Sequence, residues 1–355
     1  MSPQMKSARM IFISCLIALV ILPLTAFANN PHARPFGDVK TLAQVPDPGF
    51  PEGIAVRGNL VYVAGPASFE TAGMPPSYVI AYDTRTGETV RTYTIEGEFL
   101  AAPHANSCIA FDDDGRLYVV NIQLGIVRID LGSGEQSVYA PPVPQLNPQV
   151  PALMNDIAFD PEGNLYLTDS LQATIWRIPP GGGTPQVWFQ DPSLVTNFSV
   201  NGLRLSPDSK RIFFSVTSES APGSPDFTGG RIYSLPLVDA PTAADLQLFH
   251  QYSGGAPDGI AFGRSGKLYV MLAAPGFSGV SILSPAGEEV ARIVNPPAPP
   301  PVGLITPFNS PANGAFDKHG SLLVTNHAFA IPGNVSVLSV YVDDKEAPLV
   351  KPNVP

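Results

Sequence analysis

The sequence predicts an all-β protein that folds as a six-bladed β-propeller. The first observation is a pattern, clearest at residues 154–170 (MNDIAFDPEGNLYLTDS), in which a polar residue precedes an apolar run, a tight turn and a second strand. The second is that copies of this pattern begin, 46 to 57 residues apart, at Glu52, Ser107, Asn155, Asn201, Asp258 and Asn313. The third is that each copy has room for four short strands. Repeats of this length and content are typical of propeller blades.

Each repeat reads as four strands joined by Gly- and Pro-rich turns. In the third repeat we expect strands at 156–160, 164–169, 174–178 and 186–190, with PEG and PPGGGTP as turns. The first repeat places its later strands at 78–83 and 89–95, and the fifth at 280–283 and 290–294. A β-sandwich is the alternative, but sandwiches do not repeat at this period.

Residues 38–45 (DVKTLAQV) have strand character and precede the first repeat as an outer strand would. Pairing them with the last repeat would close the ring and leave no exposed sheet edge. We therefore expect one propeller domain at 29–355. Its blades would cover roughly residues 52–96, 107–140, 155–190, 201–251, 258–295 and 313–344, with 38–45 as the closing strand.

The first 28 residues resemble a secretory signal peptide, with Lys6 and Arg9, an apolar run at 10–24 and an A-x-A site at 26–28. An uncleaved anchor is the alternative. We expect a secreted or periplasmic protein without a membrane contact after removal of the signal. Loss of Lys6 and Arg9 changes the formal net charge from -10 to -12, which argues against nucleic acid as a partner. Cys15 leaves as well, so Cys108 has no disulfide partner and is expected to be buried.

Long connections fall on one face of the predicted ring, at 66–76, 97–106, 140–153, 218–229 and 296–312, and contain no Lys or Arg. Binding sites usually lie on such loops. The connections of this face also hold Phe50, Phe69, Phe99, Phe198, Phe227, Phe277, Phe308 and Phe329. These rings either line an apolar mouth for an uncharged ligand or simply pack the loops onto the scaffold.

Four oxygen-bearing side chains share one register, immediately before the innermost strands: Glu52, Asn155, Asn201 and Asp258. Inner strands line the central channel, so these residues should converge near its axis. Two carboxylates and two amides suit Ca²⁺, with Mg²⁺ or Mn²⁺ less favoured. Asn-Gly and Asp-Gly are also common turn pairs, but turn preference does not explain Glu52 or the shared register.

Further polar residues are expected at the same face and could contact substrate or water. Ser107 with Asn106 and, one residue out of register, Asn313 occupy the corresponding position of the other two repeats. The ends of the second strands add Asn121, Asp169, Asn326 and His327. His104 could point inward as a general base, or could be a hydrogen-bonded surface residue.

At these residues the chain resembles the senescence marker protein/gluconolactonase/luciferin-regenerating-enzyme family over roughly residues 38–344. FPEG matches the motif with a metal-binding glutamate (Glu52), VNGL that with a metal-binding asparagine (Asn201), and PDGIAF that with a metal-binding aspartate also proposed as base (Asp258). NDIAFDPEG matches the motif with a substrate- or metal-contacting asparagine (Asn155). The resemblance implies a six-bladed propeller and a Ca²⁺- or Zn²⁺-dependent lactonase.

Where sugar-lactone members carry polar or cationic loop residues, this chain has Phe and Pro. The expected function is therefore metal-assisted hydrolysis of a largely apolar lactone or ester, a small-molecule substrate held near Phe69, Phe99 and Phe308. Asp258 would activate the water, with His104 in reserve. The alternative is a non-catalytic or strictosidine-synthase-like propeller that binds a ligand and keeps a structural cation.

Overall fold

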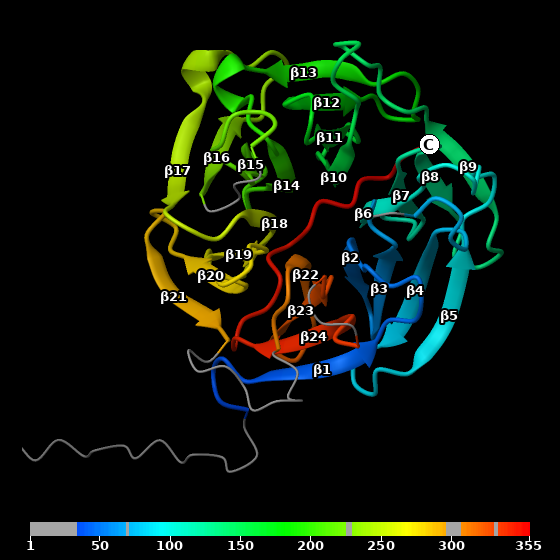
Figure 1. Cartoon of the computed structure of the whole chain (residues 1–355), viewed down its shortest axis with the longest axis vertical. Helices are drawn as coiled ribbons and strands as arrows, with labels where there is room; N and C mark the ends of the chain where they lie inside the picture. Colours follow the sequence, from blue (N-terminus) through cyan, green and yellow to red (C-terminus); the bar gives the residue numbers. More distant parts are fainter. Residues whose placement is uncertain (1–33, 69–70, 225–228, 296–306, 330–332) are drawn as a thin grey trace, which may run out of the picture. The chain divides into compact units, whose positions relative to one another are not determined.

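Six four-stranded antiparallel sheets surround a central channel in the computed structural model (Figure 1), which describes residues 34–68, 71–224, 229–295, 307–329 and 333–355. Residues 35–355 form one compact unit. The only helices in these ranges are two single 3₁₀ turns, η1 (Pro192–Leu194) and η2 (Ala243–Asp245). None of the described residues forms a helix long and apolar enough to cross a membrane. The predicted signal peptide at 1–28 lies outside the described residues.

The strands of each blade follow one another in sequence, from the channel outward. Blade 1 contains β2 (Ile54–Arg57), β3 (Leu60–Gly65), β4 (Tyr78–Asp83) and β5 (Thr89–Thr94). Blade 2 contains β6 (Asn106–Phe111), β7 (Leu117–Asn121), β8 (Gly125–Ile129) and β9 (Gln136–Ala140). Blade 3 contains β10 (Met154–Phe159), β11 (Leu165–Asp169), β12 (Thr174–Ile178) and β13 (Gln186–Gln190).

The remaining blades repeat this order, except that the last one borrows its outer strand. Blade 4 contains β14 (Val200–Leu205), β15 (Arg211–Val216), β16 (Gly230–Pro236) and β17 (Gln247–Tyr252). Blade 5 contains β18 (Pro257–Phe262), β19 (Leu268–Leu272), β20 (Gly279–Leu283) and β21 (Glu289–Val294). Blade 6 contains β22 (Pro311–Phe316), β23 (Ser321–Asn326), β24 (Ser336–Tyr341) and, from the other end of the chain, β1 (Val39–Gln44).

The closing strand confirms the sequence prediction. β1 pairs antiparallel with β24, from Val39 opposite Val340 to Gln44 opposite Ser336. The two lie side by side at the edge of the ring although they are far apart in sequence (Figure 1). This pairing completes blade 6 and leaves the ring without a gap.

The hydrophobic core lies between the blades. Six clusters of buried side chains are found in the described residues, one for each pair of neighbouring blades. Trp176 of blade 3, for example, packs with Tyr118 of blade 2. Because each sheet packs against a neighbour on each face, its middle strands are buried on both faces, as in β7 and β11.

A bulge at the start of each inner strand sets the direction of the functional side chains. In β10, Met154 pairs with Asp169 and Ile157 with Leu167, so that Asn155 and Asp156 together face the single residue Thr168. The same shift occurs in β6, β14, β18 and β22. Glu52 and Gly53 likewise share Ala64, through hydrogen bonds of 2.8 and 2.9 Å. A bulge re-aims the side chains of its two residues and leaves backbone groups outside the ladder.

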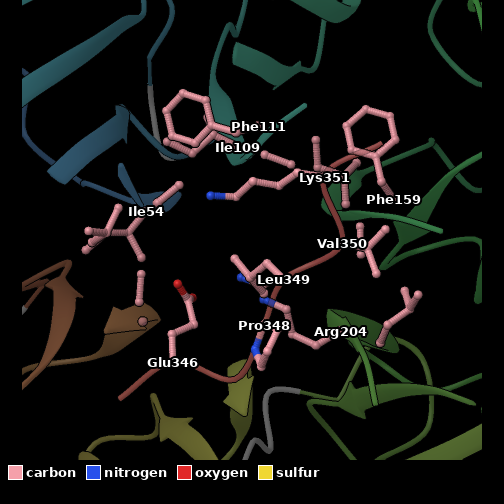
Figure 2. A pocket seen from close by; sticks show the side chains of 18 of the residues that line it. Ile54, Ile109, Phe111, Phe159, Arg204, Glu346, Pro348, Leu349, Val350 and Lys351 are labelled. Carbon is pink, nitrogen blue, oxygen red and sulfur yellow. The ribbon is translucent and has the colours of Figure 1, made fainter. Parts of the chain in front are cut away.

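Residues 345–355, here called the C-terminal strap, cross the channel (Figure 1) at the end where the inner strands finish. Ala347 N donates to Phe262 O of blade 5 at 2.9 Å, and Asp113 N of blade 2 donates to Pro352 O at 3.1 Å. Figure 2 shows Glu346, Lys351 and Arg204 around a small cavity of about 60 Å³ between the strap and the inner strands. The predicted blades end at 344, and the strap was not foreseen as a separate feature.

Candidate functional site

The four side chains that share a register in sequence meet at one cavity. Glu52, Asn155, Asn201 and Asp258 all line a cavity of about 360 Å³ at the end of the channel opposite the strap. They are 6, 8, 2 and 8 % exposed, so each is almost completely withdrawn from solvent. A buried carboxylate is stable only when a nearby group compensates its charge, so Glu52 and Asp258 require a cation or a hydrogen-bond donor close by.

The bulges sort the inner-strand residues into two rings. The first bulge residue of each strand belongs to what we call the cavity ring: Glu52, Ser107, Asn155, Asn201, Asp258 and Ala312. The second belongs to what we call the second ring: Gly53, Cys108, Asp156, Gly202, Gly259 and Asn313. The residues that line the large cavity include five of the cavity ring and none of the second ring.

Glycine is needed in the second ring because the strands approach closely there. A Cβ at Gly202 would lie 2.4 Å from the carbonyl oxygen of Asp258, and one at Gly259 would lie 2.5 Å from Asn313 Oδ1. Both distances are shorter than a non-bonded contact allows. The Asn-Gly and Asp-Gly pairs of the sequence thus serve close packing around the channel, and the first residue of each pair faces the cavity.

Asn201 presents an unpaired carbonyl oxygen. Its Nδ2 donates to Thr217 Oγ1 at 2.9 Å, and Thr217 Oγ1 in turn donates to Pro257 O at 2.8 Å. Because the Thr217 proton is used for Pro257, its oxygen must accept from Asn201, which fixes the orientation of the amide. Asn201 Oδ1 is buried and has no hydrogen-bond partner among the described residues. A buried acceptor left in this state fits a cation that is held here.

Asp258 carries the most strongly perturbed carboxyl group of the cavity. Burial away from water, and then the nearby carboxylates of Glu52 and Asp156, hold its pKa well above the usual range. These are the conditions under which a divalent cation binds well, since it would neutralise the carboxylates that repel one another. Two carboxylates and two amide oxygens form a hard ligand set. Among the described residues no three His, Cys, Asp or Glu side chains form a metal-holding group, so the amides are essential to this fit.

His327 joins the site beside Glu52. Its Nε2 lies 2.5 Å from Glu52 Oε2, and both side chains line the cavity. The imidazole ring also meets the Phe329 ring edge-on, with centroids 4.9 Å apart. The sequence predicts His327 at this face as a contact to substrate or water, and the structure brings it directly against Glu52, one of the predicted ligands.

The rest of the cavity wall is mostly apolar and comes from the loops and strand ends of all six blades. It comprises Ala67, Ala105, Ile122, Leu153, Met154, Phe198, Ala256, Ala273, Ala274, Pro275 and Phe329, with Ser68, Thr217, Asn309 and Ser310 as further polar residues. Neither Lys nor Arg is among the described residues that line it. The cavity therefore combines an oxygen-rich ring with walls suited to hydrocarbon.

The structure places several predicted site residues elsewhere. His104 is fully buried but does not line the cavity, and its ring nitrogens lie 2.9 Å from Pro75 O and 3.0 Å from Ala102 O. Both nitrogens are thus engaged by the backbone of nearby loops. A general base must reach the reacting water, so this position corrects the assignment of His104 as the reserve base.

Asn106, Asn121 and Asp169 hold loops in place instead of facing the cavity. Asn121 Nδ2 donates to Asn106 Oδ1 at 3.0 Å and to Glu98 Oε1 at 2.6 Å. Asp169 accepts from Leu153 N at 2.9 Å and from the Gln172 amide at 2.7 Å. These bonds saturate the side chains, and none of the three lines the cavity.

Asn313 belongs to the second ring, because Ala312 takes the cavity-ring position of blade 6. Asn313 Oδ1 accepts from Arg204 Nη2 at 3.3 Å, and Asn313 Nδ2 donates to the buried Cys108 at 3.7 Å. The one-residue slip seen in the sequence is therefore real. It removes Asn313 from the substrate side and makes it part of the layer beneath.

Only some of the phenylalanines predicted to line the mouth do so. Phe198 and Phe329 line the cavity, whereas Phe99 is 69 % exposed and Phe308 is buried in the core between blades 5 and 6. Phe69 and Phe227 lie outside the described residues. Ile122, Leu153 and Thr217 were missed. Thr217 directly follows β15, at the same strand ends that drew attention to His327, and that position could have indicated it.

Comparison with known proteins agrees with this architecture. The family model described as "SMP-30/Gluconolactonase/LRE-like region" matches residues 74–302. A gluconolactonase from Zymomonas mobilis is 32 % identical over 106 residues, which cover 28 % of this chain and 27 % of that enzyme. The fold is similar to the calcium-binding protein regucalcin from Agrobacterium tumefaciens, with a TM-score of 0.62, 18 % identity, and 89 % and 96 % of the two chains covered.

A gluconolactonase from Xanthomonas campestris is also similar, with a TM-score of 0.57, 19 % identity, and coverage of 85 % of this chain and 88 % of that one. At such identities the structural likeness concerns the fold alone, and it confirms the six-bladed propeller. The family match covers well over half of the sequence and includes three of the four predicted ligands, Asn155, Asn201 and Asp258. The chain belongs to the SMP-30/gluconolactonase/LRE-like family.

Proposed function

We propose that this protein is an exported, cation-dependent hydrolase of the lactonase or esterase type that acts on a largely apolar lactone or ester. The observation that supports it best is the unpaired Oδ1 of Asn201 among Glu52, Asn155 and Asp258, in a cavity whose remaining wall is mostly apolar. The relatives named as gluconolactonases support the reaction class. Ca²⁺ is the proposed ion, since the donors are all oxygen and one relative is named as calcium-binding.

The cation site would use Glu52, Asn201 and Asp258, with Asn155 on the same ring as a fourth donor or a contact to substrate. A bound Ca²⁺ would supply Lewis-acid polarisation of the ester carbonyl. Zn²⁺ remains an outcome of a metal assay, but Cys108 is occupied beneath the ring and His104 lies outside the cavity. Among the described cavity residues, nitrogen from a ring is thus offered only by His327 and soft sulfur only by the Met154 thioether.

Asp258 is the proposed general base. It would take a proton from a water as the water oxygen bonds to the carbonyl carbon, and the proton would pass to the leaving oxygen when the acyl C–O bond breaks. A lactone would give one hydroxy acid, so atoms balance with one water consumed. The near-complete burial of Asp258 keeps bulk water away from its carboxylate.

The cavity wall favours substrates with a hydrocarbon body. With neither Lys nor Arg among the described lining residues, the body of a substrate bound away from the ion would find no cationic side chain to pair with a phosphate or carboxylate. Beyond the cavity ring and His327, the polar side chains of the described wall are Ser68, Thr217, Asn309 and Ser310. Ile122, Leu153 and Phe198 would instead bury an alkyl or aryl substituent.

Hydrolysis of a lactone panel tests the proposal. Metal-depleted protein is assayed on sugar, alkyl and aryl lactones and on aryl esters, with and without added Ca²⁺. We expect turnover only with the cation and a higher kcat/KM for the apolar lactones. If Ca²⁺ binds and raises the Tm but no lactone or ester is hydrolysed, the protein is a binding propeller with a structural ion. Preference for sugar lactones would contradict the apolar substrate alone.

Export is part of the proposal and is tested separately. Residues 1–28 have the pattern of a cleaved signal, and we propose a secreted or periplasmic location. Mass spectrometry of the protein from cell fractions should find a mature N-terminus near Asn29 outside the cytoplasm. A chain that keeps residues 1–28 would contradict cleavage.

A further inference from the structure

Three hydroxyl side chains occupy the same position in three different blades. Thr168 of β11, Ser215 of β15 and Thr325 of β23 each stand opposite the two bulge residues of the inner strand. Their side chains are completely buried. Polar groups at 0 % exposure must find hydrogen bonds within the protein, so their partners show what they do.

Each of these hydroxyls donates to the backbone of the next blade. Thr168 Oγ1 donates to Asn201 O at 2.7 Å, and Ser215 Oγ donates to Asp258 O at 2.6 Å. Thr325 Oγ1 donates to Glu52 O at 2.8 Å, which joins blade 6 to blade 1. All three acceptors are carbonyls of cavity-ring residues, and all three of those residues are proposed cation ligands.

The two threonines also bind the bulge of their own blade. Thr168 Oγ1 accepts from Asp156 N at 2.9 Å, and Thr325 Oγ1 accepts from Asn313 N at 3.0 Å. In a bulge the backbone N–H of the second residue has no partner in the strand ladder, and a buried N–H without a hydrogen bond lowers the stability of the fold. Each threonine hydroxyl thus accepts from a bulge N–H of its own blade and donates to the carbonyl of a predicted ligand in the next blade, which links the two blades.

The equivalent positions of the other blades carry no hydroxyl. They are Ala64, Val120 and Met271, and they precede Ser107, Asn155 and Ala312 of the cavity ring. Packing of the propeller therefore does not itself require a hydroxyl here. The hydroxyls occur where the following cavity-ring residue is Glu52, Asn201 or Asp258.

We propose that Thr168, Ser215 and Thr325 are positioning residues that hold the peptides of three cation ligands in the geometry that binds the ion. Cation ligands must be placed within a few tenths of an ångström, and hydrogen bonds to the groups behind them set that placement. Fixing the carbonyl of Glu52, Asn201 and Asp258 fixes the plane of the peptide that follows the ligand. This inference rests on the proposed cation site.

Calcium titration of metal-depleted protein by calorimetry tests the inference without using activity. Thr168→Val, Ser215→Ala and Thr325→Val remove the hydroxyl with little change of shape. We expect each to raise the Kd for Ca²⁺ about tenfold or more. Thr168→Ser and Thr325→Ser keep the hydroxyl and should bind Ca²⁺ as the unaltered protein does.

Thr174→Val is the matched control. Thr174 of β12 is also completely buried, and its hydroxyl donates to Gln172 O at 2.8 Å, away from the cavity ring. It should lower the Tm as the other valine variants do and leave the Kd for Ca²⁺ unchanged. Ser215→Ala is the smallest change and decides the matter if a valine variant does not fold.

The outcomes separate the two proposals. Folded Ser215→Ala and valine variants that bind Ca²⁺ with unchanged Kd would overturn the positioning role while the cation site stands. Serine variants or Thr174→Val that lose affinity as much as the hydroxyl-free variants would also overturn it. Failure of the unaltered protein to bind Ca²⁺ would instead overturn the proposed function, and the positioning role with it.

Discussion

Arg204 Nη1 lies 2.9 Å from Asp156 Oδ2, directly below the cavity ring, and the Asp156 side chain is fully buried. The same carboxylate also accepts from Leu203 N at 2.8 Å and from Ile157 N at 2.7 Å. One ion pair therefore ties blade 3 to blade 4 beneath the proposed ligands. Arg204 is the only cation paired with a fully buried second-ring carboxylate in the described residues.

Removing the guanidinium should destabilise the protein strongly. Arg204→Met leaves the Asp156 carboxylate buried without its counter-ion, which costs about 3–5 kcal/mol in comparable pairs. The double variant Arg204→Met with Asp156→Asn removes both charges and should recover most of that loss. Urea unfolding of the metal-depleted proteins at pH 7 measures both. Equal stability of the single and double variants would show that the charge of Asp156 is compensated by other groups.

Asp258→Asn should abolish turnover and weaken Ca²⁺ binding, yet stabilise the metal-free protein. Burial and the carboxylates of Glu52 and Asp156 raise the pKa of Asp258 in the folded state. Its contribution to stability is thus present at low pH and is lost as the pH rises through that raised pKa, whereas the amide of the variant does not titrate. The Tm advantage of the variant should grow with pH. At a free Ca²⁺ concentration of 100 times its Kd, the ion should stabilise the unaltered protein, but not the variant, by about 2.7 kcal/mol.

Full turnover and full calcium content in Asp258→Asn would refute the role of this carboxylate as ligand and base. Asp160→Asn provides a comparison, because Asp160 is a buried carboxylate in the turn of blade 3 that accepts from Asn164 N at 2.8 Å. It lies outside the cavity and should alter stability without affecting the Kd for Ca²⁺.

The strap should make stability depend on pH near neutrality. Burial raises the pKa of Glu346 to about 7, against the lowering effect of Arg204 and then Lys351. The folded state therefore holds the proton more tightly than the unfolded chain, and stability falls as the pH rises from about 4.5 through 7. Glu346→Gln should match the unaltered protein at pH 5 and exceed it by about 1–3 kcal/mol at pH 8. Denaturant unfolding at both values measures this. A variant with an unchanged pH dependence would refute it.

A polar group in the wall should reduce activity on apolar substrates without affecting the ion. Ile122→Asn places an amide where the proposed substrate buries hydrocarbon, and the kcat/KM for an alkyl lactone should fall about 10- to 100-fold. The Kd for Ca²⁺ should stay the same. Leu124→Asn alters a neighbouring side chain that packs outside the cavity and serves as the control. Equal kcat/KM for Ile122→Asn and the unaltered enzyme would show that the substrate does not contact this wall.

Much of the fold could be read from the sequence because each blade repeats the same short pattern. The predicted strand 78–83 coincides with β4, and the predicted closing strand contains β1. The shared register also brought Glu52, Asn155, Asn201 and Asp258 to one cavity. Repetition makes such predictions reliable, since an error in one copy is exposed by the others.

What the sequence could not provide depends on contacts between distant segments. The sequence shows Asn313 one residue out of register, but only the bulge, with Pro311 opposite Asn326, shows that this shift turns Asn313 into the second ring. His104 is held by carbonyls of two loops whose paths follow no pattern. The bridge from Thr325 to Glu52 spans 273 positions. No local signal marks a partner at that distance.

The borrowed outer strand of blade 6 means that the ring cannot close before nearly all of its strands have been made. β1 is synthesised first among the strands, and its partner β24 is synthesised last. Blades 1 to 5 can form in succession as the chain emerges, but β1 must stay without its partner until translation of β24 is complete. Pairing of β1 with β24 joins the two ends of the ring, where Glu52 of blade 1 meets the Thr325 hydroxyl and His327 of blade 6. The proposed ion site therefore requires residues from both sides of the seam, so its full ligand set is assembled only when the ring is closed.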